Sequence, residues 1–181
     1  MTKKKIGVFV GSLRKGSYSK MAARYVSGLL SERYDIEFVE MEGLSYYNED
    51  LDQPGNVSPD FAAFREQVKG LDAFLFATPE YNRSMPAVLK NALDIASRGE
   101  NLWSGKPGAL IASSIGHIGG ACGAGALRVP LAFLNVRMME QPEVYIAGAS
   151  AIWDEQGNIV NESTAKFLQK FASSFAAWIE K

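Results

Sequence analysis

The sequence predicts one α/β domain over residues 1–181, in which an open parallel sheet of five strands lies between two layers of helices. Short apolar runs alternate along the chain with segments of helical periodicity. Apolar runs of this kind are typical of strands that are buried on both faces of a parallel sheet. No linker or internal repeat interrupts the pattern. The five units fit the strand order 2-1-3-4-5 better than 3-2-1-4-5-6, although the pattern alone leaves both open.

Five runs are expected to form the strands. Residues 5–10 are a short β-branched run, and residues 35–41 alternate apolar and polar side chains, as a strand near a sheet edge does. Residues 72–78 and 106–114 are largely apolar, so they are expected at the centre of the sheet. Residues 142–148 supply the fifth strand.

Helices are expected in the intervals between the strands. Apolar residues recur at helical spacing over residues 21–30. Residues 43–58 are polar and contain glycine and proline, so they are expected to be a long loop without a strand. Ser58 and Pro59 then provide an N-cap and a first-turn proline for a helix that extends to about Gly70.

Three more helices follow. One covers residues 85–99 and ends at a glycine. The next follows the glycine-rich residues 115–125 and extends to about Met139, and Pro130 within it should kink the helix or delay its start. The last helix is expected to begin at residues 161–163 and to place its aromatic face against the core.

The composition excludes several classes of function. The 19 basic and 20 acidic residues give a net charge of −1, which argues against nucleic-acid and polybasic membrane binding. One cysteine and one histidine cannot form an internal disulfide or a Cys/His metal cluster. No signal peptide is recognisable, and no run of about 18 apolar residues could form a membrane span. A cytoplasmic protein is therefore expected.

Three of the predicted strands are followed by loops whose residues suit ligand binding, at residues 11–20, 79–85 and 113–120. In open α/β sheets, ligands bind beyond the carboxyl ends of the strands, where the strand order reverses. The three loops meet in one crevice if the strand order is 2-1-3-4-5. The sequence thus predicts a ligand site formed by these loops.

The first loop, GSLRKGSYSK, has the shape of a phosphate-binding loop but departs from two known motifs. Gly11 and Gly16 have the spacing of a P-loop, yet Ser17 and Tyr18 stand where lysine and serine or threonine are required. The dinucleotide pattern G-x-G-x-x-G is also absent. Triphosphate hydrolysis and dinucleotide binding are thus both disfavoured.

What remains in this loop is a set of hydroxyl groups that leads into a helix N-terminus. The hydroxyls of Ser12, Ser17 and Ser19 and the first N–H groups of the helix can donate to phosphate oxygens, and Arg14 adds charge. This set suits a terminal phosphomonoester such as that of FMN. The alternative is an ordinary strand-to-helix loop with a serine cap.

The other two loops suit a planar ligand. In the second loop, Pro79 stiffens the exit from the strand, Tyr81 offers an aromatic face, and Asn82 tolerates unusual backbone angles. Backbone amides there can reach the polar edge of a flavin ring. In the third loop, glycines at residues 116, 119 and 120 would let the backbone approach a planar ligand.

Three motifs carry a family resemblance: GSLRKGSYS at residues 11–19, TPEYNRSMPAVLKNALD at residues 78–94, and S-x-G-x-x-G-G at residues 114–120, or the variant from residue 113. In this order and spacing they resemble the NADPH-dependent FMN reductase family, which includes bacterial chromate and quinone reductases and some azoreductases. The resemblance covers nearly the whole chain. It implies a flavodoxin-like three-layer fold, bound FMN, and homodimers that often pair into homotetramers.

The resemblance also implies which residues hold the cofactor. Ser12, Arg14 and Ser19 would bind the FMN phosphate, with Ser17 beside them. The family commonly has asparagine where Ser19 stands, so this serine keeps a donor with a shorter reach.

The remaining implied contacts are to the isoalloxazine and ribityl groups. From one side these come from Pro79, Glu80, Tyr81, Asn82 and Arg83. From the other side they come from Ser113 and Gly116. No catalytic side chain and no metal ligand is assigned.

With FMN bound, NAD(P)H would pass a hydride to the flavin N5 and leave as NAD(P)+. A quinone, free flavin, azo compound or metal oxyanion such as chromate would then take the electrons in the same pocket, which gives ping-pong kinetics. A flavodoxin-like electron carrier and a flavin-binding sensor, both without NAD(P)H reductase activity, stay open as alternatives. The net charge of −1 disfavours the carrier, since carriers usually dock through a strongly acidic surface.

Three more residues attract attention. His117 is interpreted as a solvated loop histidine, and Cys122 as a small buried residue. For Trp103, two interpretations stay open: packing in the core, or covering the flavin of a partner subunit.

Overall fold

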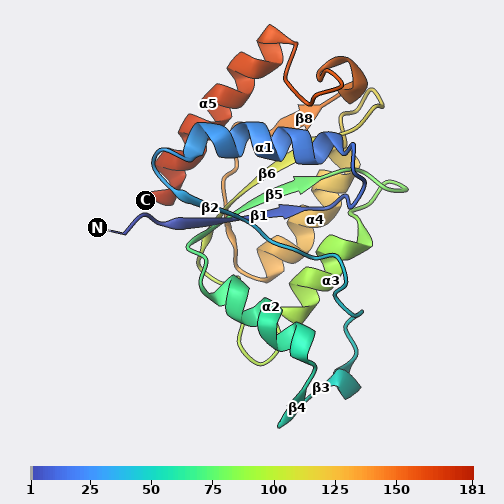
Figure 1. Cartoon of the computed structure of the whole chain (residues 1–181), viewed down its shortest axis with the longest axis vertical. Helices are drawn as coiled ribbons and strands as arrows, with labels where there is room; N and C mark the ends of the chain where they lie inside the picture. The colour runs from blue at the N-terminus through green and yellow to red at the C-terminus, as the bar shows by residue number, and fades with distance from the viewer. Residues whose placement is uncertain (1) are drawn as a thin grey trace.

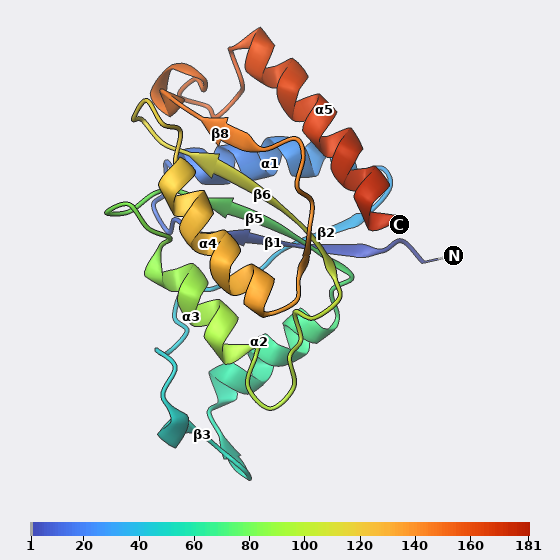
Figure 2. The same cartoon turned by 180° about the vertical axis from the view of Figure 1, so that it is seen from behind.

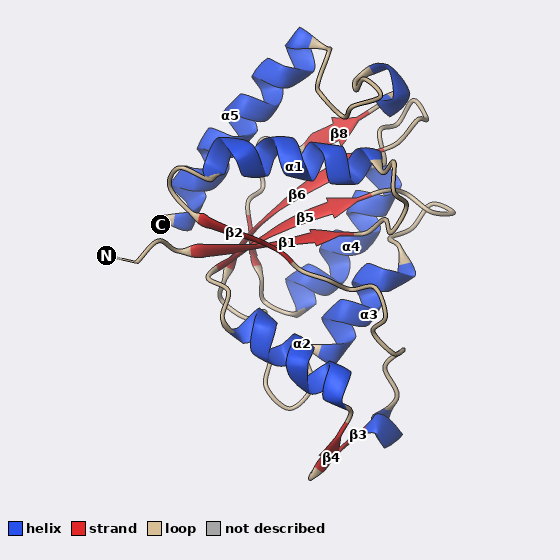
Figure 3. Ribbon diagram, viewed as in Figure 1, coloured by secondary structure: helices blue, strands red, loops and turns tan. Residues whose placement is uncertain are grey.

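A parallel sheet forms the centre of the molecule (Figure 3). The computed structural model describes residues 2–181. The sheet has the order β2-β1-β5-β6, β7 and β8 both pair with β6, and every pairing is parallel. Its strands are β1 (Lys5–Val10), β2 (Asp35–Phe38), β5 (Ala73–Thr78), β6 (Pro107–Ser113), β7 (Arg137–Met138) and β8 (Val144–Ile146). This is the predicted order 2-1-3-4-5, and the predicted fold class is confirmed.

The fifth position of the sheet differs from the prediction. Two short strands fill it: β7 pairs with the start of β6, and β8 pairs with the end of β6. The preceding helix stops at Phe133 and does not reach Met139, because Asn135 takes a left-handed backbone (φ 57°), which ends helices. Pro142, between the two strands, has no N–H to donate to the ladder. One expected strand is therefore two.

Two layers of helices enclose the sheet (Figures 1 and 2). On one face lie α1 (Tyr18–Leu30) and α5 (Glu162–Ile179), and on the other lie α2 (Pro59–Lys69), α3 (Ala87–Ile95) and α4 (Ala121–Phe133). Since side chains alternate along a strand, the central strands β1, β5 and β6 supply both cores. Val8 and Leu75 face α1 and α5, whereas Phe9, Phe74 and Phe76 face the other three helices.

Trp103 is fully buried in the second of these cores. Its ring packs edge-on against Phe9 and Phe74, with centroids 5.2 and 5.0 Å away. Its indole N–H donates to the carbonyl of Leu93 at 3.1 Å. Of the two interpretations of Trp103, the structure shows core packing, and the side chain is not available to a partner subunit.

Capping side chains account for two helix starts but not for a third. Ser17 caps α1 and accepts from the N–H of Lys20, and Asn161 caps α5. Ser58 occupies the N-cap position of α2 and Pro59 its first turn, as expected, but the Ser58 hydroxyl makes no capping hydrogen bond and donates to the carboxylate of Asp60 instead. In α4, Pro130 lies in the last turns and does not delay the start of the helix.

The expectation of a strandless loop at residues 43–58 was also wrong. This segment carries a 3-10 turn, η1 (Glu49–Leu51), and a short antiparallel hairpin of β3 (Asp52–Gln53) and β4 (Asn56–Val57). A glycine between the two strands, at φ 81°, allows the tight turn. Figures 1 and 3 show the hairpin projecting from the body beside α2.

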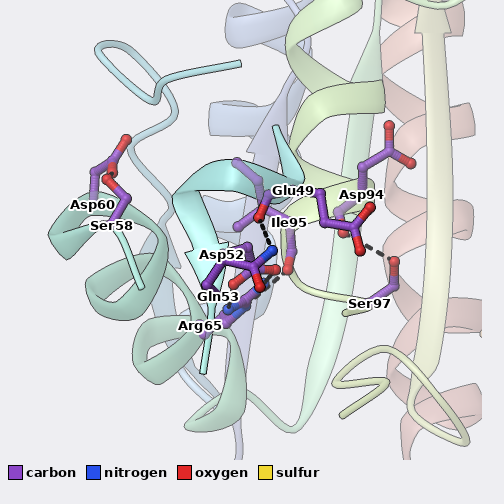
Figure 4. Close-up of polar contacts among 9 residues, drawn as sticks. All are labelled: Glu49, Asp52, Gln53, Ser58, Asp60, Arg65, Asp94, Ile95 and Ser97. Carbon is purple, nitrogen blue, oxygen red and sulfur yellow. Dashed lines mark hydrogen bonds and ion pairs between the residues drawn. The ribbon is translucent and has the colours of Figure 1, made fainter. Parts of the chain in front are cut away.

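A charged pair fastens this projecting segment to the body (Figure 4). Both terminal nitrogens of Arg65 donate to the carboxylate of Asp52, at 2.6 and 2.7 Å. The Nε of Arg65 donates to the carbonyl of Ile95 at 2.9 Å. Such a two-pronged contact fixes orientation as well as distance. The hairpin is thus tied to both α2 and the end of α3.

In the described residues 2–181, no helix is long and apolar enough to cross a membrane.

Candidate functional site

The three loops predicted to form a site open onto one cavity of about 400 Å³ at the carboxyl edge of the sheet. They leave β1, β5 and β6, which are neighbours in the sheet. The cavity is lined by Ser12, Arg14, Ser17, Tyr18, Ser19, Pro79, Glu80, Tyr81, Ser113, Ser114 and Ile115. Eight of the eleven residues predicted from the sequence are in this set.

One end of the cavity carries donors suited to an anion. The first N–H groups of α1 point there, as they do at any helix start. Ser17 takes up the N–H of Lys20, and those of Tyr18 and Ser19 have no acceptor among residues 2–181. The guanidinium of Arg14 lies over the ring of Tyr18, 5.1 Å from its centroid, which holds the charge at the cavity wall.

Two buried hydroxyl groups, one from the first loop and one from the third, are hydrogen-bonded to each other. The Oγ atoms of Ser19 and Ser113 are 2.8 Å apart, and either one can be the donor. Both side chains are about as buried as the core, at 2% exposure each. Ser19 was expected to bind the phosphate together with Ser12 and Arg14, and its pairing with Ser113 is a contact that the sequence did not indicate.

Glu80 makes a structural contact that the sequence did not indicate. Its Oε2 accepts the N–H groups of Cys122 at 2.9 Å and of Gly123 at 3.1 Å. Helix α4 has no capping side chain of its own, since Gly120 occupies the N-cap. Glu80 therefore caps α4 from another loop, where a negative charge is favoured by the helix dipole. Its carboxylate is committed to the helix, although the residue still lines the cavity.

The second loop turns back on itself beyond Glu80. Tyr81 and Ser84 exchange two backbone hydrogen bonds of 3.0 Å around a two-residue turn. Asn82 and Arg83 at its tip have φ values of 50° and 63°, the pattern of a type I′ turn. Both are exposed and outside the cavity lining. The hydroxyl of Tyr81 reaches back toward Ser12, 3.4 Å from its Oγ.

Two glycines of the third loop, Gly119 and Gly120, lie close to other parts of the protein. A Cβ on Gly119 would lie 2.7 Å from the carbonyl carbon of Tyr145, and one on Gly120 would lie 3.2 Å from the Cβ of Ala112. Both glycines have positive φ values. Gly116 donates its N–H to the Oγ of Ser114 at 3.1 Å and is outside the cavity lining.

Similarity to known proteins covers the whole of this architecture. Residues 4–151 match the family of NADPH-dependent FMN reductases. The chain belongs to this family.

Curated relatives are similar over nearly their full length. A 2-hydroxy-1,4-benzoquinone reductase of Burkholderia sp is 46% identical over 178 residues, which is 97% of this chain and 96% of the relative. An NAD(P)H-dependent FMN reductase of Pseudomonas aeruginosa is 41% identical over 172 residues, 94% of this chain and 92% of the relative. Among solved structures, FerB, a flavoenzyme NAD(P)H:(acceptor) oxidoreductase of Paracoccus denitrificans, is 38% identical with a TM-score of 0.87, covering 98% of this chain and 97% of FerB.

Set against the predicted site of an FMN reductase, the cavity adds three residues and leaves out three. Asn82, Arg83 and Gly116 were predicted but are not part of the lining. The added residues are Tyr18, Ser114 and Ile115. Each lies in a predicted loop, one or two residues after a predicted serine. Their position in these loops could therefore have identified them.

The two remaining candidate residues are both exposed and outside the cavity lining. His117 is exposed, in line with its interpretation as a solvated residue. Cys122 is also exposed, so its interpretation as a buried residue was wrong. It stands at the start of α4, and its Sγ is 4.0 Å from a guanidinium nitrogen of Arg83. Within residues 2–181, no group of three or more His, Cys, Asp or Glu side chains could hold a metal.

Proposed function

We propose that this protein is an NAD(P)H-dependent FMN and quinone reductase that holds FMN in the 400 Å³ cavity. One observation carries the proposal: a single cavity combines an anion site at the start of α1 with a wall built from residues 79–81 and 113–115. A phosphate-bearing planar cofactor needs both. The family match and the reductases named above support the same activity.

The donors at the first loop fit a phosphomonoester. The free N–H groups of Tyr18 and Ser19, the hydroxyl of Ser12 and the guanidinium of Arg14 offer hydrogen bonds and positive charge. Ser17 lines the same end of the cavity, but its Oγ already accepts the N–H of Lys20 in α1. We assign the cofactor phosphate to this end.

The other predicted residues are assigned to the ring and the ribityl chain. Pro79, Glu80 and Tyr81 would contact them from one wall of the cavity. The opposite wall is formed by the third loop, residues 113–115. Asn82, Arg83 and Gly116 would act from the mouth of the cavity. In this assignment Glu80 holds the loop in place through α4, and the backbone beside it faces the ligand.

Bound FMN supplies the hydride and electron transfer chemistry that side chains cannot supply. The residues of the chain bind the phosphate, orient the ring and limit its solvent exposure. No side chain in the cavity needs to act as a general acid or base for this reaction. The chain works as one domain in this proposal, since the three loops come from one sheet.

The acceptor is a small molecule, and a quinone is the preferred class because two curated relatives of at least 43% identity are named for quinone reduction. Free flavins, azo compounds and chromate are the other candidate acceptors. We further propose a homodimer or homotetramer. The outer face of α4 supports this, since Val129 and Phe133 are 72% and 87% exposed. A cytoplasmic location is proposed from composition alone.

Steady-state kinetics test the proposed function. The purified protein should be yellow or become so with FMN, and should oxidise NADH or NADPH in the presence of a benzoquinone. The rates with each nicotinamide, against a quinone and against free FMN, define the preferred substrates. FMN binding without NAD(P)H oxidation would overturn the reductase proposal in favour of an electron carrier or a sensor. No FMN binding would overturn the assignment of the cavity.

A further inference from the structure

We propose that Ser113 is a positioning residue that supports the cofactor phosphate through Ser19, from the far wall of the cavity. This inference rests on the proposed function, because it concerns the same site. It differs from the family-based expectation that Ser113 touches the flavin ring. Its basis is the hydrogen bond of 2.8 Å between the two Oγ atoms.

The hydroxyls of Ser19 and Ser113 have one more proton than the hydrogen bond between them uses. Each serine hydroxyl has one proton to donate and two lone pairs to accept with. One hydrogen bond between the two oxygens uses one of their two protons. The second O–H has no acceptor among residues 2–181, because neither side chain makes another hydrogen bond there. Both residues line the cavity and are 2% exposed, so the second proton calls for an acceptor on a ligand.

Position decides which hydroxyl faces the ligand. Ser19 stands in the first turn of α1, beside the free N–H groups, and lines the cavity together with Arg14. An anion held there draws the proton of Ser19 toward itself. The proton between the serines must then come from Ser113, so the chain of donors runs from Ser113 to Ser19 to the phosphate. Hydrogen bonds in such a chain strengthen one another.

This orientation of the Ser113 hydroxyl also determines how its oxygen can bond to a further group. With its proton directed to Ser19, its oxygen can only accept. Phosphate binding therefore prepares an acceptor at the end of β6, from which the third loop departs. In this way the anion site and the opposite wall are coupled through two buried hydroxyls that come from residues 94 positions apart.

Binding of FMN and riboflavin, which differ only in the phosphate, separates the proposed role from direct ring contact. The affinities are measured by flavin fluorescence quenching on apoprotein. Ser113→Ala should weaken FMN binding about five-fold, the effect of one hydrogen bond, and change riboflavin binding by less than about two-fold. In the Ser19→Ala background, Ser113→Ala should cause no further loss of FMN affinity, since the chain is already broken.

The 31P resonance of bound FMN gives a second readout, which should shift in Ser113→Ala. Ser27→Ala is the matched control: Ser27 is also buried, in α1, and its Oγ has no partner among the described residues. It should leave the ratio of FMN to riboflavin affinity unchanged. If Ser113→Ala does not fold, Ser113→Cys, which is only slightly larger than serine, fills the site, weakens the donor and should show the same selective loss.

Equal losses of FMN and riboflavin affinity would overturn the proposal in favour of direct contact with the ring or ribityl chain. Independent, additive effects of the two serine substitutions would also overturn it, as would an unchanged affinity for FMN. A wild-type protein that binds neither flavin would instead refute the proposed function.

Discussion

The carboxylate of Glu80 accepts the backbone N–H of Cys122 at 2.9 Å and thereby joins the loop after β5 to the start of α4. The second bond, from Gly123 at 3.1 Å, makes the same oxygen the cap of that helix. Glu80, a residue expected to touch the cofactor, thus also links the loop after β5, which lines the cavity, to helix α4.

Glu80→Ala should destabilise the protein by about 1–2 kcal/mol, because two N–H groups of α4 lose a charged acceptor. Glu80→Gln should recover part of this loss, since it keeps an acceptor oxygen without the charge. Urea denaturation measures the unfolding free energies, and FMN titration measures the effect on the loop. A Glu80→Ala protein as stable as the wild type would show that the link contributes nothing.

Gly123→Ala should disturb the same junction from the helix side. A Cβ there would lie 3.0 Å from the carbonyl oxygen of Pro79 and 3.1 Å from the Cα of Glu80, so the loop must shift. We expect weaker FMN binding and no gain in stability. Gly28→Ala is the control, because this α1 glycine has nothing within 4 Å of a Cβ and should stabilise the helix by about 0.5–1 kcal/mol. Similar gains from both substitutions would contradict the prediction.

Arg83 holds a left-handed backbone, with φ 63°, that glycine adopts at no steric cost. Arg83→Gly and Arg83→Ala remove the same side chain and its 3.4 Å contact with Glu80. Only the glycine relieves the backbone, so Arg83→Gly should be more stable than Arg83→Ala by about 1 kcal/mol. Thermal unfolding of the two variants measures this difference, and equal melting temperatures would argue against a strained turn.

The Asp52–Arg65 pair should make stability depend on acid pH. The hydrogen bonds from Arg65 lower the pKa of the Asp52 carboxyl below its ordinary value. Because the folded pKa lies below the unfolded value of about 3.9, the pair contributes its full stability above that pH and loses it as the pH falls through the folded pKa.

Asp52→Asn should therefore destabilise the protein by about 2 kcal/mol near neutral pH, and by progressively less below about pH 4. Unfolding free energies across this range measure the difference from the wild type. Asp50→Asn, at an exposed neighbour without an ion pair among residues 2–181, is the control and should leave the unfolding free energy near neutral pH close to that of the wild type. A difference between Asp52→Asn and the wild type that does not change with pH would rule out titration of Asp52 as its source.

Arg14→Ala should weaken FMN binding about ten-fold or more, since a charged hydrogen bond contributes about 1.5–3 kcal/mol. Lys15→Ala, the matched loss of one positive charge in the same loop, should have a much smaller effect, because Lys15 is exposed and outside the cavity lining. Titrations at two salt concentrations check the result. Equal losses in both variants would point to general electrostatic attraction rather than a contact by Arg14.

Local patterns were sufficient to predict most of the fold. Apolar runs and helical spacing located β1, β5 and β6 and four of the five α-helices to within a few residues, since burial on one or two faces leaves a period in the chain. The helix end at Phe133 was missed because a left-handed Asn135, rather than the apolar pattern, terminates α4. The hairpin at β3 and β4 was missed because two-residue strands leave no periodicity.

The sequence by itself determined the three loops that carry the chemistry, because each follows a strand whose apolar pattern is unmistakable. Only the tertiary structure decided what the polar side chains in those loops do. Ser19 meets Ser113 across 94 residues, and Glu80 reaches α4 across 42. Such contacts arise only after the parallel strands align in the sheet and bring their carboxyl ends together. No local pattern encodes them, because a hydroxyl or a carboxylate bonds to whichever donor the fold places beside it.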